Sequence, residues 1–542
     1  MKTNPNRFWL LVILLGWVFD FLFWEKPWGV NFVIYVSLCI VTGIYLLRTD
    51  GLRLSRSGGL LLLPVAFFAA VTFFRREPMT VFLSVAMTLF LMGIFALTYR
   101  GGNWTRYRIF DYLIGYLSLF GSMLARPLGF ASEVKRDQPS LSEKRGASIW
   151  PILRGIVIAL PVIAIFASLL SSADLVFAKR FEEFIDLFNI ENLPEYIFRM
   201  VYILVFAYAL AGAFLHAAQK SDDTVVEKNL IPSFLGFTES AIVLGSVTAL
   251  FAAFVVIQFQ YFFGGQSNIN IEGYTYSEYA RRGFGELVAV AFFSLLMLLG
   301  LGGITKRETE IQQRVFSTLG IVLVGLVIVM QVSAFQRLVL YENVYGFSRL
   351  RTYTHVFMLW LALLLIVVVA LELLKKERAI GFAMVLASLG FVATLGLLNV
   401  DAFIVRHNIQ REINGYTKTA EQGNDTETVR GGRVELDTQY FGELSDDSIP
   451  ALVDAFRNKA LAESVHEKIG AALACRRYDR EQDERAIPWQ GFQLSSFFAD
   501  RAFAEINRDL DAYTVTNDFS PAGTTATTPS GEEISCWGYY ID

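Results

Sequence analysis

Residues 354–399 read THVFMLWLALLLIVVVALELLKKERAIGFAMVLASLGFVATLGLLN. Two apolar runs, 354–374 and 379–399, flank the charged segment 375–378. Each run is long enough for a helix to cross about 30 Å of hydrocarbon. The stretch therefore predicts two consecutive membrane-spanning helices whose charged turn stays in water.

Further apolar runs recur along residues 1–400. They lie at about 8–24, 30–47, 60–74, 80–98, 110–125, 155–171, 197–215, 234–257, 284–304 and 315–335. Of the 542 residues, 54% are hydrophobic and 18% are charged, whereas soluble proteins carry roughly 25% charged residues. We therefore expect an all-α fold, a polytopic membrane helical bundle of about 11–12 transmembrane helices with a small helical soluble C-terminal domain. This class excludes soluble enzymes, nucleic-acid-binding proteins and disordered chains.

The run 110–125 decides the orientation of the chain. It carries Asp111 and ends at Arg126-Pro127, so we expect it to lie in the membrane interface instead of crossing. About eleven crossings then remain, and the basic residues gather on one side, which is expected to be cytoplasmic. These basic segments lie at 2–7, 48–56, 100–154, 220–228, 306–314 and 375–378. An odd number of crossings places the C-terminal region outside, whereas a crossing at 110–125 would place it in the cytoplasm.

Charge separates two regions of the chain. Residues 1–400 hold 33 Lys and Arg against 26 Asp and Glu (+7), and residues 401–542 hold 14 against 25 (−11), which together give the net charge of −4. We expect a transmembrane domain at 1–400 with a basic cytoplasmic linker near 126–150, a helix exit and linker at 401–435, a small acidic helical domain at 436–515 and a flexible tail at 516–542. Helices are expected from 449 and over 461–478 and 492–512. The negative charge argues against nucleic acid as a partner and leaves the lipid bilayer and another envelope protein.

Three cysteines are present, and two of them lie in the acidic region. Cys475 and Cys536 can form one disulfide if this region faces an oxidising compartment. Two unrelated cysteines are the alternative interpretation. The third, Cys39, lies within a predicted span.

Several segments together resemble a known family. They are LLSSADLVFA at 169–178, QFQYFFGG at 258–265, YARRGFGEL at 279–287, Tyr341-Glu342, Tyr345-Gly346, Arg349-Leu350-Arg351, Asn399-Val400-Asp401, Asn408, LSDDSIPAL at 444–452, Trp489 and Ala502. The chain resembles, over about 150–510, a prokaryotic multi-pass inner-membrane family catalogued only as a domain of unknown function. The resemblance implies a plasma-membrane location. Because that family has no established activity, the resemblance implies no catalytic residue.

Charged residues in or beside the spans are the candidate polar or anion-binding site, because a charge in hydrocarbon is costly. Glu239 lies near the start of its run and either takes part in a relay or ion site or simply pairs at the interface. Arg282 and Glu286 are four residues apart, so they share a helix face and form either a site or an ion pair that fixes depth. Arg349 and Arg351 suit phosphate or carboxylate, although arginines near lipid phosphates are also ordinary.

No catalytic, phosphate-loop or metal-ligand motif is present, so we expect no cofactor and no metal. The sequence does not decide whether the protein is an enzyme, and the lack of a catalytic motif favours a protein without enzymatic activity. The favoured hypothesis is an envelope sensor or assembly factor with an extracytoplasmic C-terminal domain. The alternatives are a transporter for a small polar or anionic solute and a membrane-embedded enzyme acting on a lipid-linked substrate.

Overall fold

In the computed structural model, eleven described helices are long and apolar enough to cross a membrane. The structure describes residues 4–137, 170, 179, 193–219, 233–262, 284–413, 436–482, 488–517 and 524–536. The candidate spans are α1 (Pro5–Phe23), α2 (Val30–Thr49), α3 with α4 (Arg56–Leu60 and Leu62–Phe74), α5 (Pro78–Thr98), α6 (Ile109–Asp137), α9 (Leu193–Ala217), α11 (Phe237–Phe262), α13 (Phe284–Ile304), α14 (Glu310–Tyr345), α15 (Arg349–Leu373) and α16 (Ile380–Leu398). The prediction of a polytopic helical membrane protein is confirmed. The predicted span at 155–171 lies outside the described residues, apart from Leu170.

The chain divides into two compact units. The first contains residues 1–25, 37–54 and 117–220, and the second contains 26–36, 55–116 and 221–542. The second unit therefore joins the C-terminal region to many of the membrane helices.

In the first unit, α1 and α9 pack against each other in antiparallel directions. The Asp20 carboxylate accepts hydrogen bonds from Arg199 Nε at 3.0 Å and Nη2 at 2.6 Å, and Asp20 is buried. The rings of Phe19 and Phe206 stack with their centroids 3.9 Å apart. The carboxylate of the first span is thus neutralised by an arginine of a neighbouring span.

Helix α6 contains the predicted interfacial run and continues through Pro127 to Asp137. It is long enough to count as a candidate span, although its mean hydropathy of 1.3 is the lowest among them. Its large exposed hydrophobic residues recur every three or four positions along one face: Phe110, Leu113, Leu117, Phe120, Leu124 and Leu128. A helix with such an apolar stripe suits a membrane surface as well as a crossing.

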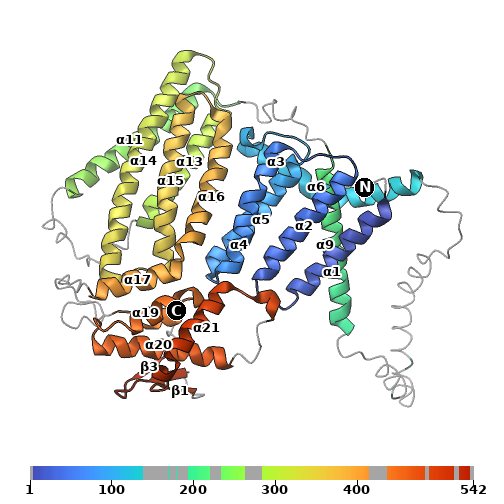
Figure 1. Cartoon of the computed structure of the whole chain (residues 1–542). Coiled ribbons are helices and arrows are strands. Elements are labelled where there is room, and N and C mark those ends of the chain that lie inside the picture. The colour runs from blue at the N-terminus through green and yellow to red at the C-terminus, as the bar shows by residue number, and fades with distance from the viewer. Residues whose placement is uncertain are drawn as a thin grey trace. The chain divides into compact units, whose positions relative to one another are not determined.

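In the second unit, α13, α14 and α15 bury a shared apolar core. Leu295 of α13, Val327 and Ala334 of α14, and Leu361 and Leu365 of α15 belong to it. Figure 1 shows α14, α15 and α16 side by side, with α17 (Val400–Ile413) lying across one end of this group.

The opposite end of these helices is closed by polar contacts. The Lys306 N–H donates to the Leu235 carbonyl at 2.9 Å, and Arg307 pairs with Glu372 at 2.7 Å. These contacts tie the start of α11 to the ends of α13 and α15. We call this the far end of the second unit, because the C-terminal region packs at the other end.

The C-terminal region forms a small helical domain with a short sheet. Its elements are α18 (Gln439–Gly442), α19 (Ile449–Phe456), α20 (Glu463–Gln482), α21 (Leu494–Leu510), β1 (Thr514–Asn517), β2 (Thr524–Thr527) and β3 (Glu533–Ser535). Phe441, Leu452, Ile469 and Ile506 are fully buried in its core. The three predicted helices are confirmed, and Pro450 lies in the first turn of α19.

The segment predicted as a flexible tail, 516–542, contains strands among its described residues up to 536. Strands β1, β2 and β3 form an antiparallel sheet in that order. Ala526 is fully buried, and a disulfide joins Cys536 of this segment to Cys475 of α20. The threonine-rich composition therefore reflects strand preference, stabilised by a covalent link.

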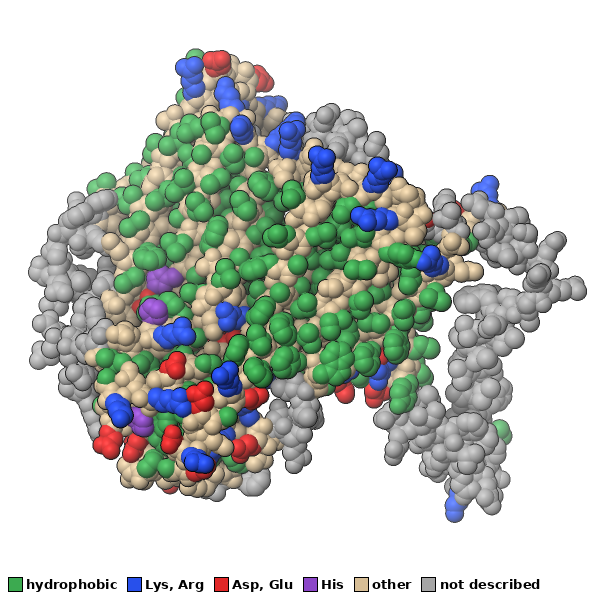
Figure 2. All heavy atoms as spheres, in the orientation of Figure 1, with side chains coloured by type: hydrophobic (Ala, Val, Ile, Leu, Met, Phe, Trp, Pro, Cys, Tyr) green, Lys and Arg blue, Asp and Glu red, His purple; other side chains and the backbone are tan. Residues whose placement is uncertain are grey.

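Side-chain chemistry changes along the helix axes of the second unit. Figure 2 shows a band of hydrophobic side chains over its helices, Lys and Arg along the far end, and mixed charges over the C-terminal domain. The basic residues at the far end include Arg56, Arg100, Arg106, Lys306, Arg307, Lys375, Lys376 and Arg378. This distribution is typical of a membrane domain with unequal faces.

Candidate functional site

The loop between α4 and α5 receives the C-terminal domain. Glu77 caps the start of α5, because its carboxylate accepts the N–H groups of Met79 at 2.9 Å and Thr80 at 2.7 Å. Proline follows at position 78, where a helix needs no N–H donor. Tyr353 of α15 donates its hydroxyl to Glu77 at 2.5 Å. The loop therefore has a fixed backbone that joins α5 to α15.

Asp447 of the C-terminal domain binds this loop through its backbone. The N–H groups of Arg76 and Glu77 donate to Asp447 Oδ2 at 2.8 and 2.9 Å. Burial raises the pKa of Asp447, although these backbone N–H groups act in the opposite direction. The carboxylate thus holds both the domain and the loop.

Asp446, the preceding residue, is surrounded by three guanidinium groups. Arg76 lies 2.8 Å, Arg476 2.9 Å and Arg480 2.5 Å from its carboxylate oxygens, and the Ser496 hydroxyl donates at 3.1 Å. Burial alone would raise the pKa of Asp446, but the positive charges of the three arginines hold that pKa below its usual value. Because Arg76 belongs to the α4–α5 loop, this cluster connects the domain to the membrane helices.

Arg349, at the start of α15, and Asp401, near the start of α17, form a second charged contact. Arg349 Nε and Nη2 donate to the two Asp401 oxygens at 2.8 and 2.6 Å, and Asp401 is fully buried. The Ser445 N–H also donates to Asp401, at 2.7 Å, and the Arg349 N–H donates to the Tyr440 hydroxyl at 2.8 Å. The C-terminal domain therefore contacts this ion pair directly. We call the Asp446, Asp447 and Asp401 contacts together the junction.

Arg351, the second arginine predicted for the site, lies in the first turn of α15, and its side chain turns back onto the end of α14. Its guanidinium lies 4.3 Å from the centroid of the Tyr341 ring and donates to the Gly346 carbonyl. Asn408 of α17 hydrogen-bonds both the N–H and the carbonyl of Phe347 in the same loop, at 2.7 and 3.0 Å. The loop between α14 and α15 is thus bound to α17.

The other predicted site residues do not join this cluster. Glu239 lies in the first turn of α11 at the far end, where it accepts the Gly236 N–H at 2.9 Å. Glu286 is an exposed residue in the first turn of α13, and Arg282 lies outside the described residues. The structure therefore places Arg349 and Arg351 in the first turn of α15 and Glu239 at the opposite end of the unit. Whether any of them binds a ligand stays a prediction.

Sequence reasoning missed the arginines that matter most at the junction: Arg75, Arg76, Arg476 and Arg480. Arg76 and Asp446 are 370 positions apart, so no local pattern links them. A signal was present in each partner alone, since Arg75-Arg76-Glu77 is a charged turn between two spans and 444–452 is part of the family resemblance.

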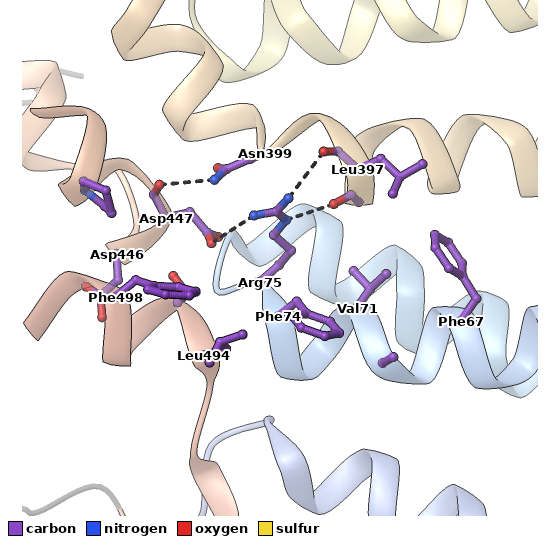
Figure 3. A pocket seen from close by; sticks show the side chains of 14 residues that line it. Phe67, Val71, Phe74, Arg75, Leu397, Asn399, Asp446, Asp447, Leu494 and Phe498 are labelled. Carbon is purple, nitrogen blue, oxygen red and sulfur yellow. Dashed lines mark hydrogen bonds and ion pairs between the residues drawn. The ribbon is translucent and has the colours of Figure 1, made fainter. Parts of the chain in front are cut away.

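A cavity of about 290 Å³ lies beside the junction, between α4, α16 and α21 (Figure 3). Its apolar side is formed by α4 and the end of α16, and its polar end by Arg75, Asn399 and Asp447. None of the four described residues among those predicted for a polar or anion site lines it. Among the described residues, no cluster of His, Cys, Asp and Glu has a geometry that holds a metal ion.

A second ionisable pair inside the described candidate spans, besides Asp20 and Arg199, is formed by α14 and α15. Glu342 of α14 lies 3.1 Å from His355 Nδ1 of α15, and Glu342 is 2% exposed. The ring of Phe335 packs on His355 with centroids 4.6 Å apart, and Gln331 donates to the Met358 carbonyl at 3.2 Å. Polar groups are therefore buried between α14 and α15 near the junction.

These features define a multi-pass membrane protein with a C-terminal helical domain docked on its helices through charged residues. The chain belongs to the family described as Domain of unknown function (DUF4153), whose model matches residues 62–455. The family assignment made from sequence is confirmed, although the match begins earlier than 150 and ends within α19. No curated protein and no solved structure matches the chain.

Proposed function

We propose that the protein is an envelope sensor or assembly factor of the plasma (inner) membrane, with an extracytoplasmic C-terminal domain that is coupled to the membrane helices. The junction carries this proposal. Its buried carboxylates, Asp446, Asp447 and Asp401, bind groups of the α4–α5 loop and of α15. In a transporter or an enzyme we expect buried charges to follow a path through the spans. Here each carboxylate is instead hydrogen-bonded or ion-paired to groups that join the domain to the helices, even where Asp447 also borders the cavity.

Two observations support the extracytoplasmic side of the domain. The Cys475–Cys536 disulfide is typical of proteins exposed to an oxidising compartment. The far end of the second unit, opposite the domain, carries basic loops such as 305–309 and 374–379, as cytoplasmic faces do. Both observations support a domain outside the cytoplasm.

The contacts of α6 also support this side. Tyr112, near its start, donates to Trp104 just after α5, at 2.6 Å, and Phe130, near its end, packs on Phe8 at the start of α1 with centroids 5.2 Å apart. If α1, α2, α3–α4 and α5 each cross once, the start of α1 and the end of α5 lie on the same membrane face. Both ends of α6 then lie at that face, and α6 does not count as a crossing. Ten described candidate spans remain, and the predicted span at 155–171 would make the number eleven, which is odd.

The partner of the domain follows from its charge. The C-terminal 142 residues carry a net charge of −11 by the residue counts above, and acids such as Asp509 and Glu533 are exposed on the domain. A basic surface on another envelope protein suits such a face. The interaction is expected to weaken as salt concentration rises.

Labelling with a membrane-impermeant maleimide tests the side of the domain. Asp509→Cys is made in a variant whose three native cysteines are changed to serine, and Lys376→Cys in the same background is the control at the far end. We expect intact cells to label position 509 and to label position 376 only after permeabilisation. The reverse pattern would reject an extracytoplasmic domain. Labelling of both positions in the same cells would show that the reagent crosses their membrane, and the experiment is then repeated with intact cells.

A genetic complementation test addresses the role of the domain. In a strain whose loss of this protein gives an envelope defect, reversing the charges of Asp509 and Glu533 should reproduce the defect at normal protein levels. Glu286→Gln should complement fully, because this proposal gives Glu286 no role. Complementation by the charge-reversed variant would contradict the proposed partner surface.

A second candidate function is proton-coupled transport, which the Glu342–His355 pair favours. Ionisable residues buried between spans commonly mark proton or ion paths. In proteoliposomes with an imposed pH gradient, a transporter of this kind would dissipate the gradient faster than its Glu342→Gln variant. Equal rates would reject this candidate and leave the pair a structural role.

A further inference from the structure

The cavity beside the junction changes from apolar to charged over a short distance (Figure 3). Its apolar wall consists of Phe67, Ala70, Val71 and Phe74 of α4 with Gly396 and Leu397 of α16. Both helices are candidate membrane spans, so this wall lies at the depth of the acyl chains next to the membrane surface. A soluble polar ligand has no apolar surface to pack against such a wall.

Gly396 helps to keep this space open. A Cβ atom at this position would lie 3.1 Å from Val71 Cγ2, so a side chain there would crowd the wall of α4. The neighbouring Leu397 lines the cavity and is 70% exposed, and Phe74 is 48% exposed. The cavity therefore opens on the surface that the bilayer covers.

The polar end of the cavity offers hydrogen-bond donors. Arg75 Nε and Nη2 donate to the carbonyls of Gly396 and Leu397 at 2.9 and 3.3 Å, whereas Nη1 lies 3.9 Å from Asp447. Asn399 Nδ2 donates one hydrogen to the Asp447 carbonyl at 3.4 Å, and its Oδ1 accepts the Ala402 N–H at 3.3 Å. Arg75 Nη1 and the second amide hydrogen of Asn399 are suited to ester or phosphate oxygens. Donors at one end and hydrocarbon at the other match an amphiphile.

The C-terminal domain covers the cavity with an aromatic edge. Phe498 and Leu494 of α21 line the cavity, and Trp489, Phe492 and Phe497 beside them are between 41% and 57% exposed. The Gln493 side chain donates to the Arg75 carbonyl at 2.9 Å, which holds the start of α21 at the end of α4. Aromatic residues at this level are typical of the membrane–water interface.

We propose that this cavity binds one acyl chain of a phospholipid from the leaflet on the side of the C-terminal domain. The chain lies between α4 and α16, and the glycerol and phosphate groups lie at Arg75 and Asn399. Its volume of about 290 Å³ is at the lower end of the range for ligand pockets, which suits one chain and not a whole lipid. This inference is independent of the sensor proposal, because either face of a membrane supplies phospholipid.

Photolabelling tests the site directly. The full chain is reconstituted in vesicles of phosphatidylethanolamine and phosphatidylglycerol with a trace of phosphatidylcholine that carries a diazirine on one acyl chain. After irradiation, peptides are mapped by mass spectrometry. We expect label concentrated on 67–75, 396–399 and 494–498, several-fold above the other lipid-facing helices. Even labelling of all lipid-facing helices would overturn the proposal.

Matched variants separate this site from general lipid contact. Ala70→Phe fills the apolar wall, whereas Ala253→Phe adds the same bulk to an exposed position of α11 that does not line the cavity. We expect at least a threefold loss of label at 494–498 in the first variant and none in the second. Leu397→Trp blocks the opening from an exposed position and replaces Ala70→Phe if that variant does not fold. Unchanged label in a folded blocking variant would refute the site.

Discussion

Asp446→Asn is the sharpest test of the junction, because it removes one charge and keeps the shape of the side chain. Asp446 is 3% exposed and faces Arg76, Arg476 and Arg480. Breaking a fully buried ion pair costs about 3–5 kcal/mol. The three arginine side chains keep 19–37% of their exposure, and water compensates part of this loss. We therefore expect the junction to lose about 2 kcal/mol.

Amide hydrogen exchange of the reconstituted protein measures this loss locally. A cost of about 2 kcal/mol corresponds to about 30-fold faster exchange wherever local opening limits the rate. The effect should appear in the 75–80 and 446–456 segments and not in α13 or α14. Asp509→Asn, at an exposed position of α21, is the charge-matched control. If both variants exchange alike at the junction, Asp446 does not hold the domain and the reasoning fails.

Three further predictions concern the same domain. Arg349→Lys keeps the charge opposite Asp401 but loses one of two parallel hydrogen bonds, at a cost of about 1–2 kcal/mol. Amide hydrogen exchange in α17 should therefore become about tenfold faster, while the control Arg314→Lys, in an exposed ion pair, should leave it unchanged. Cys475→Ser removes a disulfide that spans 61 positions, which a chain-entropy estimate values at about 4 kcal/mol. The Tm of the domain should therefore fall below that of the oxidised wild type, and reductant that opens the wild-type disulfide should remove this difference, whereas Cys39→Ser should leave the Tm unchanged. Three arginines hold the pKa of Asp446 below its usual value despite burial, so the contribution of Asp446 to stability is present above about pH 4 and is lost as the pH falls below that value. Burial raises the pKa of Asp447, so the stability that depends on protonated Asp447 is lost as the pH rises. Denaturant unfolding between pH 3 and 6 measures the difference in the free energy of unfolding between each variant and wild type. On acidification this difference should shrink for Asp446→Asn and grow for Asp447→Asn. A change in the same direction for both variants would contradict the opposite pKa shifts of the two carboxyls.

The membrane helices could be predicted from sequence because the information is local. A run such as 379–399 contains its own evidence, since lipid accepts about 20 apolar residues only as a helix that satisfies its own backbone. The helix beginning at Ile449 was predictable for the same reason, from Ser445 to Pro450 and the apolar spacing that follows.

The junction and the short sheet could not be predicted, because both depend on distant partners. Asp401 and Arg349 are 52 positions apart, and each alone resembles an ordinary interfacial charge. Strand β2 pairs with β1 and β3 and lies in a threonine-rich segment that reads as low complexity in isolation. Nothing in a single sequence states that Cys536 closes this segment onto α20.

The pattern of attachments constrains how the C-terminal domain can act. Asp447 binds the loop that ends α4 and begins α5, Ser445 binds the pair between α15 and α17, and Arg75 ties the end of α16 to α4. A force on the domain therefore reaches four membrane helices through short, partly buried hydrogen bonds. Since the junction has no long or flexible contact in these three places, a partner must either break it as a whole or move those helices together. Both outcomes also deform the cavity between α4 and α16, so lipid occupancy and domain position are expected to be linked reciprocally.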